Sequence, residues 1–143
     1  MIIKQLSVFL ENKKGRLFAA ADTLAQNGIN IRALSLADTS EFGILRLIVD
    51  QPEHGKEVLA QSGVIVRITN VLGVLMDDVP GGTLGALHLM ADAGINVEYM
   101  YACVGKLSGK AIMVIRTDNP DLATEILECN GYADIKPEDV YRI

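Results

Sequence analysis

The sequence contains no tryptophan, and only 5% of its 143 residues are aromatic. So few aromatic side chains argue against a platform that stacks the bases of single-stranded nucleic acid. The formal net charge of −5 argues against nonspecific nucleic-acid binding as well, because that binding depends on cationic surface. We therefore expect no nucleic-acid partner.

Long apolar runs are also absent, and there are only two cysteines. No apolar stretch approaches the ~18 residues that a membrane-spanning helix needs, and no charged-then-apolar signal segment opens the chain. Cys103 and Cys129 form no C-x-x-C pair and have apolar sequence neighbours, so we expect two buried free thiols in a reducing compartment. The expectation is a cytoplasmic protein without a membrane partner.

Patterns that carry catalytic or metal chemistry are missing too. Neither His54 nor His88 belongs to a complete set of cysteine, histidine and carboxylate ligands at metal-site spacing. No nucleophile–base pair and no pair of acids stands at a suggestive spacing. We therefore expect no metal, no cofactor and no catalytic residue, although 50% hydrophobic residues predict a folded globular protein.

What the sequence does have is a repeat. Residues 15–31 read GRLFAAADTLAQNGINI, and residues 81–97 read GGTLGALHLMADAGINV. The offset is 81 − 15 = 66 residues, which is the length of a whole small domain rather than of a solenoid turn. The identical pairs are Gly15 and Gly81, Ala20 and Ala86, Ala25 and Ala91, Gly28 and Gly94, Ile29 and Ile95, and Asn30 and Asn96.

Hydrophobic periodicity predicts the order βαββαβ in both halves. In the first half the strands are Ile2 to Leu10, Asn30 to Asp38, Ile44 to Asp50 and Val64 to Thr69, with helices over Leu17 to Leu24 and from Pro52 to Ser62. In the second half the strands are Val71 to Met76, Asn96 to Val104, Lys110 to Thr117 and Val140 to Ile143, with helices ending near Ala93 and Asn130.

This order predicts an α+β fold of two ferredoxin-like modules, 1–70 and 71–143, each an antiparallel sheet with helices on one face. Asn70 is the only hint of a break between them. Pro52 and Pro120 match at an offset of 120 − 52 = 68, so the second copy has two extra residues, which we place near 105–109. Strict alternation would put Val97, Tyr99 and Tyr101 on one side of their strand.

The loops and the asparagines resemble a known family. Residues 78–81 read DVPG and residues 94–97 read GINV, while residues 12–15 read NKKG and residues 28–31 read GINI. A D-x-P-G loop, a helix and then G-I-N-I is similar to the signature of ACT domains, with Lys14 in place of the proline in the first copy. The resemblance covers nearly the whole chain and implies small-ligand sensing, usually of amino acids, at interfaces between modules. It is closest to the stand-alone tandem kind.

The resemblance also implies the site residues. In ACT sites, the position of Asn12 and that of the asparagine after Gly-Ile are the usual ligand contacts. A glycine loop at a helix N-terminus, with its unpaired N–H groups, suits a carboxylate. The expected ligand-binding residues are Asn12, Lys14, Gly15, Arg16, Leu17, Asn30, Ile31, Asp78, Pro80, Gly81, Gly82, Asn96 and Val97.

Simpler explanations exist for several of these residues. Asn30 and Asn96 are also common turn-capping residues, and Lys14 and Arg16 suit a solvated loop. Asp78 replaces Asn12 in the second copy, and an anionic side chain suits an ammonium but not a carboxylate. The divergence therefore predicts one strong site rather than two alike.

The leading hypothesis is a non-catalytic regulatory protein that binds a small amino acid at the seam between modules. Its expected partners are a second copy of the chain, giving a homodimer, and a metabolic enzyme. The alternative is a ligand-free interaction module that docks such an enzyme.

Overall fold

The computed structural model describes residues 1–38, 41–104 and 109–142. The chain divides into two compact units. We call Lys4–Thr69 the first unit, and Met1–Ile3 together with Asn70–Ile143 the second unit. These units are defined by packing, whereas the sequence modules 1–70 and 71–143 are defined by repetition and stay a prediction.

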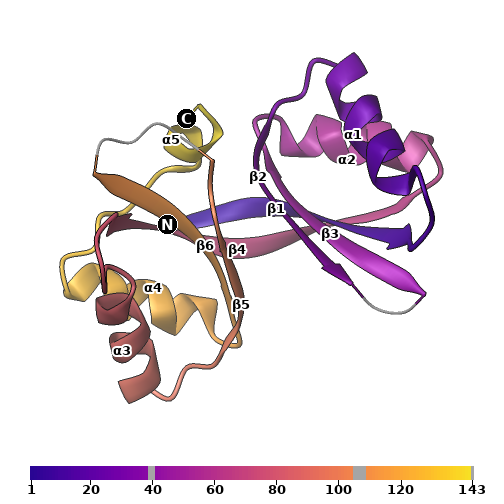
Figure 1. Cartoon of the computed structure of the whole chain (residues 1–143). Coiled ribbons are helices and arrows are strands. Elements are labelled where there is room, and N and C mark those ends of the chain that lie inside the picture. Colours follow the sequence, from indigo (N-terminus) through magenta and orange to yellow (C-terminus); the bar gives the residue numbers. More distant parts are fainter. Residues whose placement is uncertain (39–40, 105–108, 143) are drawn as a thin grey trace. The chain divides into compact units, whose positions relative to one another are not determined.

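In the first unit the strand order is β2-β3-β1-β4. The elements are β1 (Ile2–Glu11), α1 (Arg16–Gln26), β2 (Ile31–Asp38), β3 (Phe42–Val49), α2 (Pro52–Gln61) and the first part of β4 (Ile65–Asp77). Helices α1 and α2 pack against one face of the sheet (Figure 1). The core includes Leu6 of β1, Leu24 of α1, Leu47 of β3 and Leu59 of α2, each at most 2% exposed.

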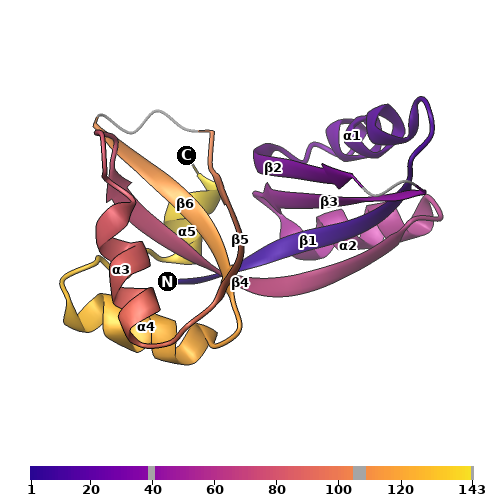
Figure 2. The ribbon, with the colours of Figure 1, turned by 60° about the horizontal axis from the view of Figure 1, so that its bottom comes forward.

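In the second unit the order is β1-β4-β6-β5, with only the first residues of β1 taking part. The remaining elements are α3 (Leu84–Asp92), β5 (Val97–Ala102), β6 (Lys110–Thr117), α4 (Pro120–Cys129) and α5 (Pro137–Tyr141). Helices α3 and α4 cover the face that carries the buried side chains of Leu72 and Ile115 (Figure 2). The predicted α+β fold of ferredoxin-like modules is confirmed.

Two predicted strand boundaries are wrong. Val64 to Thr69 and Val71 to Met76 are not separate strands, because β4 runs without interruption from Ile65 to Asp77, although the packing units change at Asn70. The carbonyl oxygen of Asn70 accepts a hydrogen bond of 2.9 Å from the Arg116 guanidinium, so this polar residue is satisfied inside the strand. The predicted insertion at 105–109 lies, apart from Gly109, outside the described residues.

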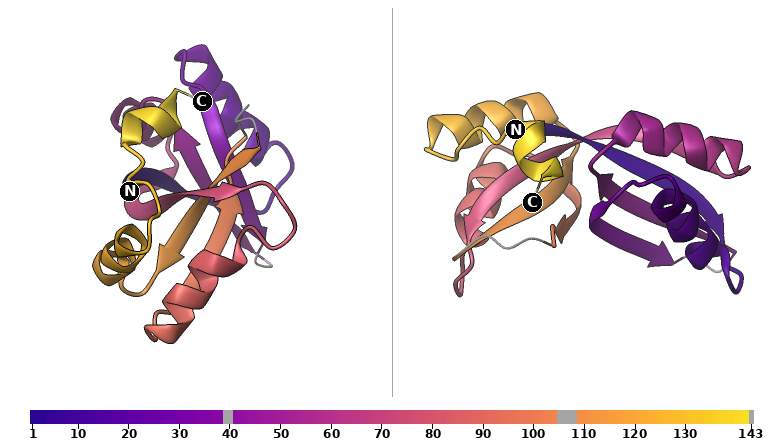
Figure 3. Two further views of the ribbon diagram at one scale, coloured as in Figure 1. Left: turned by 90° about the vertical axis from the view of Figure 1, so that its left-hand side faces the viewer. Right: turned by 90° about the horizontal axis from the view of Figure 1, so that it is seen from above.

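The predicted last strand over Val140 to Ile143 is also wrong, because Pro137–Tyr141 form helix α5. Pro137 at the first helical position and the Asp139 carboxylate, which accepts from the Lys136 N–H at 3.3 Å, start a helix there. The vacant strand position is filled by the start of β1, since the Gly73 N–H donates to the Met1 carbonyl at 2.8 Å. Figure 3 shows α5 apart from α3 and α4.

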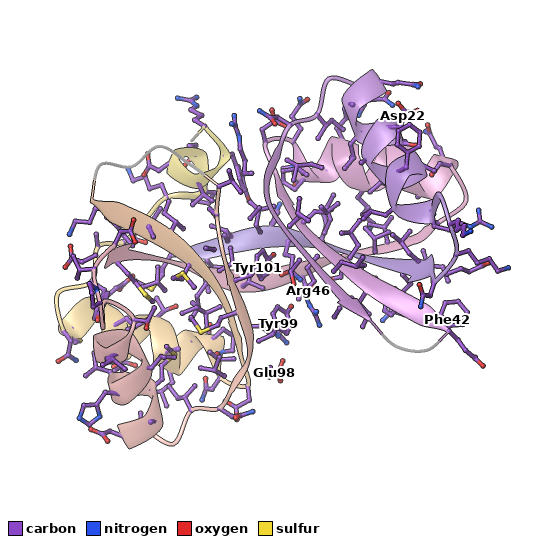
Figure 4. The ribbon with its side chains drawn as sticks, viewed as in Figure 1. Asp22, Phe42, Arg46, Glu98, Tyr99 and Tyr101 are labelled. Atoms are coloured by element: carbon purple, nitrogen blue, oxygen red, sulfur yellow. The ribbon has the colours of Figure 1, made fainter. Side chains whose placement is uncertain are left out.

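A β-bulge corrects the predicted faces of β5. The register shifts between Val97 and Tyr99, so strict alternation fails at Glu98. Val97 and Met100 both pack on the helix-covered core, while Tyr99 and Tyr101 lie on the other face (Figure 4). The equivalent bulge lies between Ile31 and Ala33 in β2.

Candidate functional site

The first predicted loop, Asn12 to Gly15, is held by backbone hydrogen bonds between β1 and α1. The Asn12 N–H donates to the Glu41 carbonyl at 2.9 Å, and the Arg16 N–H donates to the Lys13 carbonyl at 3.3 Å. Gly15 has a φ of 82°, which explains why glycine occupies the position just before the helix. The loop therefore has a defined shape without any ligand.

The second loop repeats this geometry. The Asp78 N–H donates to the Gly109 carbonyl at 3.0 Å, the Gly82 N–H donates to the Val79 carbonyl at 2.9 Å, and Gly81 has a φ of 81°. The two loops therefore share these bonds and the positive φ of Gly15 and Gly81, although Lys14 stands where the second loop has Pro80. The difference is that α3 begins at Leu84, two residues later than the position equivalent to the start of α1.

A small cleft, which we call the loop cleft, lies beside the first loop. Its volume is about 70 Å³. It brings together three predicted site residues, Asn12, Arg16 and Leu17, whereas Lys14 and Gly15 are not among its lining residues. Lys13, which the sequence suggested only as a residue that steers an anion, also lines it, and sequence reasoning missed the others, which are Leu10, Glu11, Leu36 and Gly43.

Glu11 is the residue of the loop cleft with which two basic side chains interact. Its carboxylate lies 2.8 Å from the Lys13 ammonium and 3.7 Å from the Arg16 guanidinium. The hydrogen bond from Lys13, followed by the positive charges of Lys13 and Arg16, holds the pKa of Glu11 below its ordinary value of 4.5. Two cations therefore share one anion beside Asn12.

We expect Lys13→Ala to raise the pKa of Glu11 toward 4.5, because the substitution removes the hydrogen bond that lowers it most. The ionised carboxylate stabilises the folded state above the unfolded pKa, and this contribution is lost as the pH falls through the folded value. Carboxyl-carbon NMR across an acid titration measures the midpoint. An unchanged midpoint in the variant would show that Lys13 does not govern this group.

Asn30 and Asn96 lie at the opposite end of each sheet from the loops. Glu11 pairs with Phe42 at one end of β3, and Ile31 pairs with Val49 at the other. At ~3.3 Å per strand residue, the loop and the asparagine of one unit are separated by roughly 20 Å. The structure therefore does not bring Asn12 and Asn30 together within the first unit.

Both asparagines are clamped through their backbone by an aspartate. Asp50 accepts from the Asn30 N–H at 3.0 Å, and Asp118 accepts from the Asn96 N–H at 3.0 Å. The Asp50 N–H returns a bond of 3.1 Å to the Asn30 carbonyl, and the Asp118 N–H one of 3.2 Å to the Asn96 carbonyl. The side chains of both asparagines are exposed, so the clamp leaves their amides to contact other groups.

Sequence reasoning missed the two clamping aspartates, although a signal was present. Asp50 and Asp118 each stand two residues before a repeated proline, at the offset of 118 − 50 = 68.

We expect Asp118→Ala to lower the free energy of unfolding by about 1–2 kcal/mol, because it removes a charge-assisted hydrogen bond at the start of β5. Urea denaturation measures this loss, with the conservative Asp118→Asn as the control that keeps an acceptor oxygen.

The remaining predicted residues, from both units, lie outside the loop cleft. Asp78, Pro80 and Gly81 are exposed on the loop, and Gly82 lines a separate cleft described below. Ile31 and Val97 begin β2 and β5 and pack against their cores. None of these residues lies in the loop cleft.

The cysteines depart in part from the prediction. Cys129 is exposed at the end of α4, and Cys103 is partly buried. Burial raises the pKa of the Cys103 thiol to about 11. Within residues 1–38, 41–104 and 109–142, no helix has the length and apolar character needed to cross a bilayer.

Comparison with known proteins places these features in context. Residues 1–143 match a family described as "ACT domain pair". A protein from Bacteroides thetaiotaomicron of known crystal structure is 37% identical, with a TM-score of 0.93 over 100% of this chain and 98% of its own. No curated protein matches the sequence.

More distant structures share the fold alone. The ligand-free regulatory subunit of aspartate kinase from Thermus thermophilus is 13% identical, with a TM-score of 0.63 over 90% of this chain and 92% of its own. The regulatory subunit from Thermus flavus is 15% identical, with a TM-score of 0.60 over 90% and 94%.

Proposed function

The chain belongs to the family of ACT domain pairs, and from this premise we propose that it is a non-catalytic, cytoplasmic regulatory protein that binds a small amino acid. The observation that carries the proposal is the duplicated pair of an ordered glycine loop and a clamped, exposed asparagine. The asparagine side chains are exposed, and each loop stands at a helix N-terminus, where the helix dipole favours an anion.

The separation within a unit defines how a ligand would be held. The loop and the asparagine of one unit stand roughly 20 Å apart, which is farther than a single amino acid reaches. A ligand that contacts both therefore needs the loop of one module and the asparagine of another. We propose that the ligand lies at such a seam between modules, in a homodimer.

The first loop suits the carboxylate of the ligand better than the second does. Lys14 and Arg16 bring positive charge to the start of α1, and the helix dipole adds to it. The second loop carries Asp77 and Asp78 instead, which repel a carboxylate. This supports one strong site, built on Asn12 and the first loop.

An exposed apolar strip in the first unit supports self-association. Leu34 and Leu36 on edge strand β2 are 51% and 47% exposed, and Leu17 and Phe18 on α1 are 41% and 74% exposed. Burying this strip against a second copy would remove it from water. The same strip favours the alternative, in which it docks a metabolic enzyme and no ligand is involved.

Ligand binding would regulate by population shift, because a ligand shared by two modules stabilises the packing that holds it. The test is calorimetry and thermal shift with each standard amino acid at millimolar concentration. We expect one or a few to bind the wild-type chain, with at least tenfold weaker binding by Asn12→Ala and by the double variant Asn30→Ala with Asn96→Ala. If no amino acid gives binding heat or a thermal shift, the proposal is wrong.

The double variant Asn30→Ala with Asn96→Ala also distinguishes the ligand sensor from the ligand-free interaction module. An interaction module keeps its partner when Asn30 and Asn96 become alanine, whereas a sensor loses its ligand response. Ala60→Ser, on an exposed position of α2, which contributes to neither the loops nor the apolar strip, is a control that should leave ligand binding and partner binding unchanged.

A further inference from the structure

Each unit contains a second cleft, and the two lie at the same place in the repeated fold. We call them the first-unit cleft, of about 310 Å³, and the second-unit cleft, of about 340 Å³. Every lining residue of one has its repeat equivalent lining the other, at offsets of 66 to 68. The pairs are Phe9 and Leu75, Leu10 and Met76, Glu11 and Asp77, Arg16 and Gly82, Phe42 and Lys110, Ser62 and Asn130, Gly63 and Gly131, Val64 and Tyr132, and Ile65 and Ala133.

The chemistry of the two clefts has diverged. In the first-unit cleft, Phe42 is 52% exposed and Ile65 is 64% exposed, so both present apolar surface to solvent. Figure 4 labels Phe42 at the start of β3. In the second-unit cleft, Lys110 stands at the position of Phe42, and Ala133 at that of Ile65. At these two positions the second-unit cleft therefore has a cation in place of an aromatic ring and a smaller apolar side chain. Elsewhere Gly82 stands in place of Arg16 and Tyr132 in place of Val64, so the charged and bulky side chains occupy different places in the two clefts.

Two glycines keep the second-unit cleft in its shape. A Cβ on Gly82 would lie 2.0 Å from the Asp77 carbonyl oxygen, so no side chain can stand where the first unit has Arg16. A Cβ on Gly85 would lie 2.6 Å from the hydroxyl of Tyr132, which therefore reaches the first turn of α3. The first unit has Ala19 and Val64 at the positions of Gly85 and Tyr132, so this contact belongs to the second copy.

Charges of both signs line the second-unit cleft. The Lys110 ammonium donates to the Asp77 carboxylate, and the two side chains are 48% and 60% exposed. The Asn130 Nδ2 donates to the Ile126 carbonyl at 2.8 Å, which leaves the Asn130 amide oxygen available as an acceptor. The lining of this cleft therefore provides one cationic donor, Lys110, and two acceptors, the Asp77 carboxylate and the Asn130 amide oxygen.

This set is complementary to a zwitterion. A ligand carboxylate matches the Lys110 ammonium, and a ligand ammonium matches the Asp77 carboxylate and the Asn130 oxygen. A cleft of about 340 Å³ is at the small end of ligand pockets. The first-unit cleft also has an acid and a base, Glu11 and Arg16, 3.7 Å apart, but the residues at the positions of Lys110 and Asn130 are Phe42 and Ser62.

We propose that the second-unit cleft is an additional binding site for the ammonium and carboxylate groups of a small α-amino acid, contributed by Asp77, Lys110 and Asn130. The site lies within one unit and does not use Asn12, Asn30 or Asn96. It rests on the proposed function only for the class of ligand.

The test is an amide NMR titration of the full chain with each standard amino acid at millimolar concentration. The Gly82 and Gly131 amides report on the second-unit cleft, and the Gly15 and Asn30 amides report on the site of the proposed function. We expect saturable shifts at Gly82 and Gly131. Lys110→Gln should weaken them at least tenfold, since it removes a charge-assisted hydrogen bond, and Ala133→Ile should abolish them by restoring the bulk found at Ile65.

Controls decide between the outcomes. Ile65→Ala, the reverse change in the first-unit cleft, should leave the Gly82 and Gly131 shifts unchanged. Acetate and methylamine, which each supply one charge, should shift them at least tenfold more weakly than the best amino acid. Equal effects of acetate would overturn the zwitterion site. Shifts confined to Gly15 and Asn30 would also overturn it while leaving the proposed function intact, and an absence of any shift would overturn both.

Discussion

Replacing Gly82 with alanine should destabilise the protein by about 3 kcal/mol. The new Cβ would lie 2.0 Å from the carbonyl oxygen of Asp77 and 3.2 Å from that of Val79. Both obstacles are backbone atoms, and Asp77 is fixed at the end of β4 by its pairing with Lys110. The loop between β4 and α3 would have to shift as a whole.

The usual benefit of replacing glycine acts in the opposite direction but is smaller. Gly→Ala reduces the entropy of the unfolded chain and stabilises by about 0.4–1 kcal/mol where the native backbone accepts a side chain. At Gly82 the backbone clash exceeds this gain. Urea denaturation measures the difference through the transition midpoint.

Arg16→Ala is the matched control, because Arg16 occupies the equivalent position in the first unit. Its side chain is 53% exposed, and its loss should change the free energy of unfolding by no more than about 0.5 kcal/mol. If Gly82→Ala and Arg16→Ala unfold at the same denaturant concentration as the wild type, the backbone at Gly82 is not crowded as described.

Ile3→Ala and Leu6→Ala should each destabilise by about 2–5 kcal/mol, yet in different units. The two residues stand three positions apart in the same strand, β1. Ile3, 1% exposed, belongs to the second unit, where its Cδ1 would lie 3.3 Å from a Cβ on Gly73. Leu6, fully buried, belongs to the core of the first unit.

Amide hydrogen exchange resolves the two effects. Ile3→Ala should accelerate exchange mainly in β5 and β6, and Leu6→Ala mainly in β2 and β3, because local opening follows the unit that has lost its packing. Phe9→Ala, on the same strand but 38% exposed, should have a smaller effect on stability than either. Equal acceleration throughout the described strands for both core variants would mean that β1 does not divide between two units.

The sequence alone predicted the parts of the fold that depend on local rules. Gly15 and Gly81 end their loops with a positive φ, and Gly28 and Gly94, each with a φ of 69°, end their helices. Period-two alternation located the strands, and helical spacing located Leu24 and Ala20 in the core. For the site, the loop residues Asn12, Arg16 and Leu17 line one cleft, because neighbours in a tight loop stay neighbours in space, and their binding of a ligand stays a prediction.

Long-range pairing could not be read from the same signals. The strand position that Val140 to Ile143 were predicted to fill is taken by residues from the start of the chain. The bulges after Ile31 and Val97 interrupt alternation without a local sequence mark. Asp50 and Asp118 clamp asparagines about twenty residues earlier, which only strand pairing brings within hydrogen-bonding distance.

The repeated glycine loop and G-I-N element by themselves predicted a duplicated chain that resembles an ACT domain pair, and the family match over residues 1–143 confirms that family. Only the tertiary structure decided that Asn12 and Asn30 stand at opposite ends of a sheet, and that Asp77, Lys110 and Asn130 surround one cleft. The physical reason is that sheet register and strand order depend on hydrogen bonds between residues far apart in the chain, which no local propensity encodes.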